Sequence, residues 1–536
     1  MSWYRVVLAA AGLLLVLPTA DAAYRFSTPG GKSLLLTGYL RQHMAVNLED
    51  HPEADASGMG RLDGKGDISM MRSTFRLEAK ADLGWAQFVT IYRFDREQET
   101  GFLDDINDTI NANNAPLRLN NWMDDVEGDQ MREWYGVFDI GPRVRATLGK
   151  QQVVWGETDF FRGMDIIHGF DLRWRSFLET ENEELRKPLI LANVEIDIPE
   201  LDGILQLVYR PGWDKGKALG NGLDIRGGRW ATQPNKGIDF LPLLPYNYDH
   251  PGADTDDPNY GFRWIGHAWG WDYSLNYWRG LNNDPIGNPQ AFLGTPFGAA
   301  PSNPFVLGEL IFPKVETFGA TVTGYLEGVD SVLRVELAFT PNKPYNAGPD
   351  VGLAGPVPGS TIWVPGLGGV VERDTLISMV GIDKQLKGLG RLLNTSQFPL
   401  FSVQVFDTWL MDFDGDDHIV ETFGFGAERH EHTTILTGLL QLNYDNSTVN
   451  PSIAGVVDAT NGDVVIIPAL DLVYGDHWRI HTDLDLFLIK NQRNVKNFGG
   501  FYLPEDTFAT RAEDDTHLIG TFANNSQFNL RVTYQF

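Results

Sequence analysis

The chain ends in Phe528-Asn529-Leu530-Arg531-Val532-Thr533-Tyr534-Gln535-Phe536, nine residues in which apolar and polar side chains alternate without a break. Successive side chains of a β-strand point to opposite faces, so this segment has one apolar and one polar face. That pattern is typical of a transmembrane β-barrel, whose outer face meets lipid and whose inner face meets water. Tyr534 and Phe536 would then form the insertion signal read by the barrel-assembly machinery. The alternative is an edge strand of a soluble β-sandwich.

The same alternation recurs along the rest of the chain. Clear examples lie at 34–46, 71–79, 143–148 and 436–444. A period of two predicts β-strands, and no later stretch approaches the ~20 apolar residues of a transmembrane helix. We therefore expect an all-β protein, a closed transmembrane antiparallel β-barrel of about 18 strands, with 16 as the lower bound.

Tight turns and long segments follow one another between these strands. Short periplasmic turns and long external loops are the rule for bacterial outer-membrane barrels. The pattern is weakest at 384–400 and 445–475, where Asn461-Gly462 indicates an extra short hairpin. Tight turns fit 81–84, 141–142, 200–203, 270–272, 327–330 and 475–476, and long segments occupy 47–66, 96–129, 152–188, 211–259, 281–312, 341–372, 412–430 and 491–516.

The first residues predict export. A short apolar run at 6–17 precedes Ala20-Asp21-Ala22, which has the small-x-small pattern of a signal-peptidase site. We therefore expect residues 1–22 to be a cleaved signal peptide. Residues 23–536 would form a single β-barrel surrounded by lipid in the outer membrane of a Gram-negative bacterium.

The formal net charge is −28, with 43 Lys and Arg against 71 Asp and Glu. No basic stripe is available for phosphates, so nucleic acid is excluded as a partner. The acidic residues gather between the strands, as in Asp254–Asp257 and Asp412–Asp417, and such clusters are typical of solvated loops. Acidic external loops can bridge to lipopolysaccharide through divalent cations, which makes lipopolysaccharide an expected partner.

The most distinctive segment follows the strand that ends near Gln151. Residues 152–188 do not alternate and are rich in aromatic, Arg and carboxylate side chains, as expected of a loop folded into the lumen. Such a loop selects solutes by charge and width, as ionic rings do in other channels. We expect Glu157, Asp159 and Asp165 to pair with Arg162, Arg173 and Arg175; whether they contact a solute or only brace the barrel stays open. The full predicted constriction comprises Lys150, Gln151, Trp155, Glu157, Asp159, Arg162, Asp165, Asp171, Arg173 and Arg175.

Part of this segment matches a known pattern, in Gly149-Lys150-Gln151, Val153, Trp155-Gly156-Glu157 and Asp171-Leu172. These residues resemble the shared stretch of proteobacterial outer-membrane barrels catalogued as domain of unknown function 1302, which is similar to porin-like and alginate-export-type channels. That family usually has Asn-Pro where this chain has His168-Gly169. The resemblance implies a porin-like barrel and names no substrate.

Arginines recur on one face of the early strands. Alternation places Arg72, Arg76 and Arg145 inward, because charges on the lipid face would cost several kcal/mol. A cationic ladder on one lumen wall favours anionic solutes by electrostatic focusing. The other interpretation is that these arginines pair with carboxylates across the lumen.

Neither a cofactor nor a metal site is predicted. Asp412–Asp417 lacks the twelve-residue calcium pattern, and His430 and His432 have no identifiable third ligand. Glu157 and Asp159 have the carboxylates of an acid pair for glycoside cleavage, but no other catalytic motif accompanies them. We therefore expect no enzymatic activity.

Three hypotheses for function follow. The first is a porin-like channel that passes anionic or partly apolar solutes. The second is a barrel plugged by its own loops, which serves an export or lipid-trafficking assembly with periplasmic partners. The third is an outer-membrane enzyme. Channel conductance would separate the first two.

Overall fold

The structure is a computed structural model. It describes residues 23–50, 64–113, 130–158, 161–173, 175, 178–179, 182–214, 216–231, 241–347, 351–354, 361–364, 366–421, 428–490, 495–498, 501–504 and 517–536. Among these residues, no helix is long and apolar enough to cross a bilayer.

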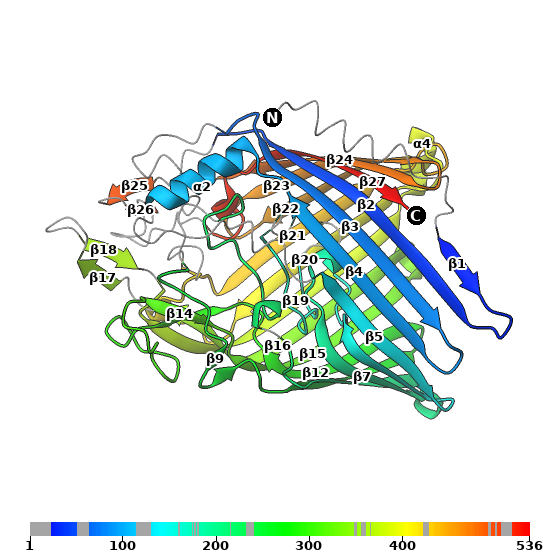
Figure 1. The fold of residues 1–536 in the computed structure, drawn as a ribbon, viewed down its shortest axis with the longest axis horizontal. Coiled ribbons are helices and arrows are strands. Elements are labelled where there is room, and N and C mark those ends of the chain that lie inside the picture. Colours follow the sequence, from blue (N-terminus) through cyan, green and yellow to red (C-terminus); the bar gives the residue numbers. More distant parts are fainter. Residues whose placement is uncertain are drawn as a thin grey trace.

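One sheet of 19 strands makes up most of the molecule. Eighteen of its strands form a barrel, and the nineteenth, β1 (Tyr24–Ser27), extends the edge of the first barrel strand (Figure 1). The barrel strands are β2 (Ser33–Asn47), β3 (Ile68–Asp82), β4 (Gln87–Glu97), β5 (Met131–Ile140), β6 (Val144–Gln151), β7 (Leu189–Ile198), β8 (Gly203–Arg210), β11 (Asn259–Ala268), β12 (Trp271–Leu281), β15 (Lys314–Leu326), β16 (Ser331–Ala347), β19 (Gly369–Gln385), β20 (Leu400–Leu410), β21 (His432–Gln441), β22 (Val449–Asp458), β23 (Val464–Tyr474), β24 (Trp478–Leu488) and β27 (Gln527–Gln535).

The barrel closes between its first and last strands. Strands β2 and β27 pair antiparallel from Tyr39 opposite Gln535 to Asn47 opposite Gln527. Every other barrel strand is hydrogen-bonded to its neighbours in sequence, also antiparallel. Closure leaves no open edge in the lipid, where an unpaired backbone group is costly. The predicted antiparallel barrel of about 18 strands is confirmed.

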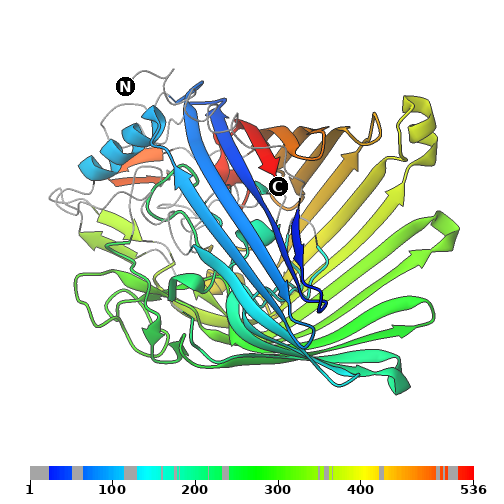
Figure 2. The same cartoon turned by 45° about the vertical axis from the view of Figure 1, so that its right-hand side comes forward.

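The two ends of the barrel differ, as Figures 1 and 2 show. One end carries the tight turns, helix α4 (Lys387–Leu393) and the C-terminus. The other carries the long segments, with helix α2 (Gly101–Asn113) and four small hairpins: β9 (Asp249–His250) with β10 (Ala253–Asp254), β13 (Ile286–Pro289) with β14 (Gly308–Ile311), β17 (Val351–Ala354) with β18 (Thr361–Val364), and β25 (Val495–Phe498) with β26 (Phe501–Pro504).

The two weak stretches of the sequence pattern have simple explanations. Residues 384–400 contain α4, a helical turn between β19 and β20. The hairpin indicated by Asn461-Gly462 joins β22 to β23, and Gly462 has a φ of +88°, which favours glycine. One connection at the long-loop end is therefore short.

The outer face of the barrel is apolar. Alternate residues of successive strands project large apolar side chains that nothing in the molecule covers, while their neighbours in sequence face the lumen and are mostly polar. This is the arrangement of a lipid-exposed barrel wall. Outward members include Leu207, Phe262, Leu275, Phe318, Leu337, Val380, Val405 and Ile453.

The two faces predict opposite responses to a new charge. Leu148 of β6 lies on the outer face, whereas the adjacent Thr147 faces the lumen. We expect Leu148→Arg to lower the free energy of unfolding in lipid vesicles by about 2–4 kcal/mol, because the guanidinium enters hydrocarbon. In the matched control, Thr147→Arg, the free energy of unfolding should fall much less. Equal losses in urea titrations would contradict the assignment of faces.

Candidate functional site

Residues 152–188 leave the wall at the end of β6 and return to it at the start of β7. Their contacts lie on opposite sides of the barrel. One set is on β15 and β16 and another on β2, β24 and β27; β15 and β2 are nine strands apart in a ring of eighteen. The described part of this segment therefore crosses the lumen.

On one wall, a single carboxylate of β16 holds the segment. Glu336 accepts hydrogen bonds from the backbone N–H groups of Glu157 and of Met164, the latter at 2.8 Å. The Thr323 hydroxyl of β15 donates to Oε2 of Glu157 at 2.6 Å. A carboxylate that accepts two backbone N–H groups satisfies both its own lone pairs and the donors of a segment that has no strand partner.

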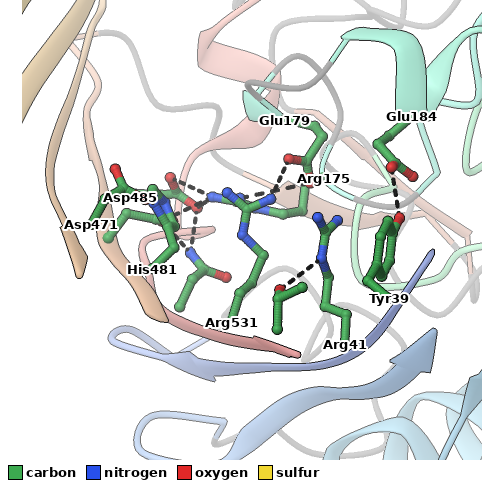
Figure 3. Close-up of polar contacts among 12 residues, drawn as sticks. Tyr39, Arg41, Arg175, Glu179, Glu184, Asp471, His481, Asp485 and Arg531 are labelled. Carbon is green, nitrogen blue, oxygen red and sulfur yellow. Dashed lines mark hydrogen bonds and ion pairs between the residues drawn. The ribbon is translucent and has the colours of Figure 1, made fainter. Parts of the chain in front are cut away.

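On the far wall, a buried ionic cluster holds the segment (Figure 3). Nη2 of Arg175 lies 2.9 Å from a carboxylate oxygen of Asp483 and 2.9 Å from one of Asp485, both on β24. Arg531 of β27 donates to Glu179 at 2.7 Å. The Arg175, Asp483 and Asp485 side chains are 2% exposed or less, so each charge depends on its partners.

A third contact joins the short helix α3 (Asn182–Leu185) to the wall. Glu184 accepts a hydrogen bond from the Tyr39 hydroxyl at 2.7 Å and forms an ion pair with Arg93 at 2.7 Å. Burial by itself raises the pKa of Glu184, but the charges of Arg93, Arg41 and Arg132 outweigh it and hold that pKa well below its usual value. Glu184 is therefore ionised.

The start and end of the segment are tied together at His168. The Val153 N–H donates to Nε2 of His168, and Nδ1 of the same ring lies 2.9 Å from the Lys187 carbonyl, so a neutral ring with its proton on Nδ1 satisfies both. Burial lowers the pKa of His168 to about 3, which keeps it neutral. At Gly169, a Cβ would lie 1.9 Å from the Gly220 carbonyl oxygen. The His-Gly pair thus fits this close turn.

Apolar packing fills much of the space between the segment and the wall. The Trp155 ring meets Trp278 of β12 edge-on at 5.9 Å, and its indole N–H donates to Gln206 of β8. Met164 joins the same buried cluster. A second cluster lies against β19 to β24 and includes Leu178 and Phe522 from the connecting segments. These side chains brace the interior.

A cavity of about 770 Å³ remains beside the segment. Among the described residues, nine Arg and Lys side chains line it, against six Asp and Glu. In a chain of net charge −28, this local excess of cations is unusual. Low-dielectric walls strengthen the field of such charges and attract anions. Burial lowers the pKa of one lining residue, Lys187, to about 8.

Several predicted site residues line this cavity, and one of them lies on the other face. Arg72 enters it from β3, and Asp171 and Arg173 enter from the segment. Lys150, predicted in the lumen, belongs to the outward row of β6, because it pairs with the outward Trp134 of β5. Its Nζ donates to the Met131 carbonyl at 3.4 Å, and it reaches the cavity from outside.

The predicted ion pairs within the segment are wrong for the described residues. Asp165 pairs with Arg186 rather than with a predicted arginine. Asp171 binds Arg173 through two hydrogen bonds of 2.8 and 2.9 Å. Arg162 lies over the Phe170 ring, and burial lowers its pKa to about 10. The partners of Asp165, Asp171 and Arg162 are therefore set by which side chains lie next to them in the fold.

The remaining predicted residues lie away from the cavity. Gln151 faces inward and donates to three backbone carbonyls, including that of Leu191. Arg76 pairs with Glu78, and Arg145 pairs with Asp139. For these two arginines, carboxylate pairing describes the structure better than a free cationic ladder. Asp159 lies outside the described residues.

Sequence reasoning missed several site residues. Glu336 and Lys187 carry no local motif, and three parallel aromatic rings, Tyr246, Tyr248 and Phe312, come from two separate loops. Parity along β16 does place Glu336 inward, which was the one available signal.

The family described as "Protein of unknown function (DUF1302)" matches residues 4–536. Among curated proteins, none matches the chain. Solved porins are similar at low identity. OccK5 of Pseudomonas aeruginosa is 7% identical, with 94% of this chain and 98% of that chain covered and a TM-score of 0.41. Salmonella typhi OmpF in complex with daunomycin is 10% identical, with 96% and 100% covered and a TM-score of 0.38. Neither likeness indicates what this chain transports.

The ionic cluster predicts a large, rescuable loss of stability. Arg175→Met leaves the carboxylates of Asp483 and Asp485 buried without the arginine they share, so the free energy of unfolding should fall by about 3–5 kcal/mol. Adding Asp483→Asn and Asp485→Asn removes the unpaired charges and should recover most of the loss. Urea titration in vesicles measures both. A triple variant as unstable as Arg175→Met would refute the role of the cluster.

Proposed function

The chain belongs to the DUF1302 family, whose function is unknown, and we propose that it is a porin-like channel of the outer membrane that prefers anionic solutes. Residues 152–188 narrow its lumen and the cation-rich cavity beside them selects by charge. The observation that carries this proposal is the excess of Arg and Lys over Asp and Glu around the cavity. Electrostatic focusing by such a wall raises the local concentration of anions.

A loop-plugged barrel remains the rival. Its support is the same crossing segment, which is held on opposite walls and packed by two apolar clusters. In that case the barrel would serve export or lipid trafficking with periplasmic partners. The two proposals differ in whether the intact protein conducts ions.

Conductance of a shortened variant tests them. An ideal Cβ on Gly156 would lie 2.9 Å from the Asp165 nitrogen, so deleting 157–164 rejoins two neighbouring points of the chain. We expect steady conductance from the intact protein in planar bilayers, and a larger conductance after the deletion. If only the deletion variant conducts, the segment is a plug and the export proposal replaces the channel. If neither the intact protein nor the deletion variant conducts ions, the proposed channel function is refuted.

Ion selectivity tests the role of the cavity cations. Under a salt gradient, the reversal potential of the intact protein should indicate a preference for anions. Arg72→Gln with Lys187→Gln should shift it toward cations, because two lining charges are removed. Arg145→Gln is the matched control, since Arg145 is paired with Asp139 away from the cavity. Equal shifts in both variants would contradict selection at the cavity.

A further inference from the structure

The barrel wall beside the cavity includes the two shortest strands of the barrel, β6 and β8. Strands β5 to β8 have 8 to 10 residues, against 15 in β2 and β3. Strand β4 pairs with β3 out to Glu97, whereas among the described residues its last backbone contact on the β5 side is the hydrogen bond from the Arg93 N–H to the Gln130 carbonyl. At ~3.3 Å per residue, the four residues of β4 beyond Arg93 make a step of roughly 13 Å in the described part of the wall.

The cavity reaches both faces of the barrel at this step. Trp134, Lys150 and Ile190 form one row of paired residues across the outer face of β5, β6 and β7. They line the same cavity as Arg72 and Arg93, which point into the lumen. Within the described part of the chain, the cavity therefore runs from the lumen, past the outer ends of these strands, to the lipid-facing surface.

The lining changes character along this path. Trp134 and Ile190 at the outer surface are apolar, and Tyr246, Tyr248 and Phe312 present nearly parallel rings at 5.8–6.1 Å. Lys150 lies between Trp134 and Ile190 at the outer surface, and cations such as Arg72 and Arg93 line the lumen side. A volume of about 770 Å³ is in the range of pockets for organic ligands. Such a pocket fits a molecule with an anionic head and an apolar body.

Polar atoms converge at one point of the cavity, around Gly222. An ideal Cβ there would lie 3.1 Å from Nζ of Lys187, 3.4 Å from Asp171 Oδ1 and 3.6 Å from Arg173 Nε. The absent side chain leaves room beside the half-buried ammonium group of Lys187, which gains from a carboxylate partner.

We propose that this cavity binds an amphipathic organic carboxylate, with its head beside Lys187, and exchanges it with the outer leaflet through the step at β5 to β7. The inference rests on the proposed channel function and names a solute class for it. A carboxylate dissolved in water and one dissolved in the membrane share this chemistry, so the tests below separate the two sources.

Binding is measured with pyrenebutyrate and the full barrel in vesicles, with protein-free vesicles to correct for partition into lipid. Lys187→Met should bind roughly tenfold more weakly, because a charge-assisted hydrogen bond is lost. Gly222→Val fills the head site without changing a charge and should also weaken binding. The control is Lys384→Met, an exposed lysine far from the cavity lining. Unchanged binding in both cavity variants would overturn the proposal, while conductance of the same samples judges the channel separately.

The pH dependence checks the head site. The charges of Asp171 and Arg173 face Lys187, whose Nζ donates to the backbone carbonyl of Lys217, and burial lowers the pKa of Lys187 to about 8. Its ammonium is present below that pH and is lost above it, so affinity should fall as the pH rises through about 8. Lys187→Arg keeps its charge and should retain affinity at pH 10. A fall of the same size in Lys187→Arg would refute the assignment.

The route is tested by a block at the outer surface. The chain has no cysteine, so Trp134→Cys can be labelled alone with a bulky maleimide. Labelling should slow pyrenebutyrate uptake from the membrane, while benzoate added in water still competes at equilibrium. Leu148→Cys, equally exposed on the same face but outside the cavity, is the control. Unchanged uptake after labelling Trp134→Cys would show entry from water and overturn the lateral route.

Discussion

The structure depends on one constraint: in hydrocarbon, every backbone N–H and C=O must find a partner within the protein. The sheet satisfies it by closing β2 onto β27. Closure with eighteen strands makes a ring too wide for its own side chains to fill. The described part of residues 152–188 and the apolar clusters around it occupy that space.

The same constraint decides where the charges go. Lipid covers the outer face, so most charged side chains of the strands point inward, with exceptions such as Lys150 near the strand ends. In the interior the dielectric constant is low and an unpaired charge is costly. The crossing segment supplies many of the partners. Arg175 pairs with Asp483 and Asp485, and Glu179 and Glu184 pair with Arg531 and Arg93. The same crossing segment therefore both fills the lumen and supplies partners for its charges.

The sequence predicts the wall better than the site. A period of two is local, so the strands, the tight turns and the limits of the long segments follow from neighbouring residues. Ion pairs in the lumen are not local: Arg175 and Asp483 are 308 residues apart, and no spacing rule relates them. The predicted placement of Lys150 in the lumen fails for a different reason. Gln151 and Lys150 are adjacent in one strand and cannot both face inward, and parity alone would have shown this.

The distribution of charge also bears on the route of a solute. Acidic residues gather in segments at the long-loop end, such as Asp254–Asp257 and Asp412–Asp417, while the cavity behind them is lined by an excess of cations. An anion that approaches through the external loops meets repulsion first and attraction only later. By the proposed lateral route, an amphipathic anion in the outer leaflet avoids those loops and enters the cavity beside β5. The short strands β5 to β8 and the acidic loops thus both favour an amphipathic anion that comes from the membrane.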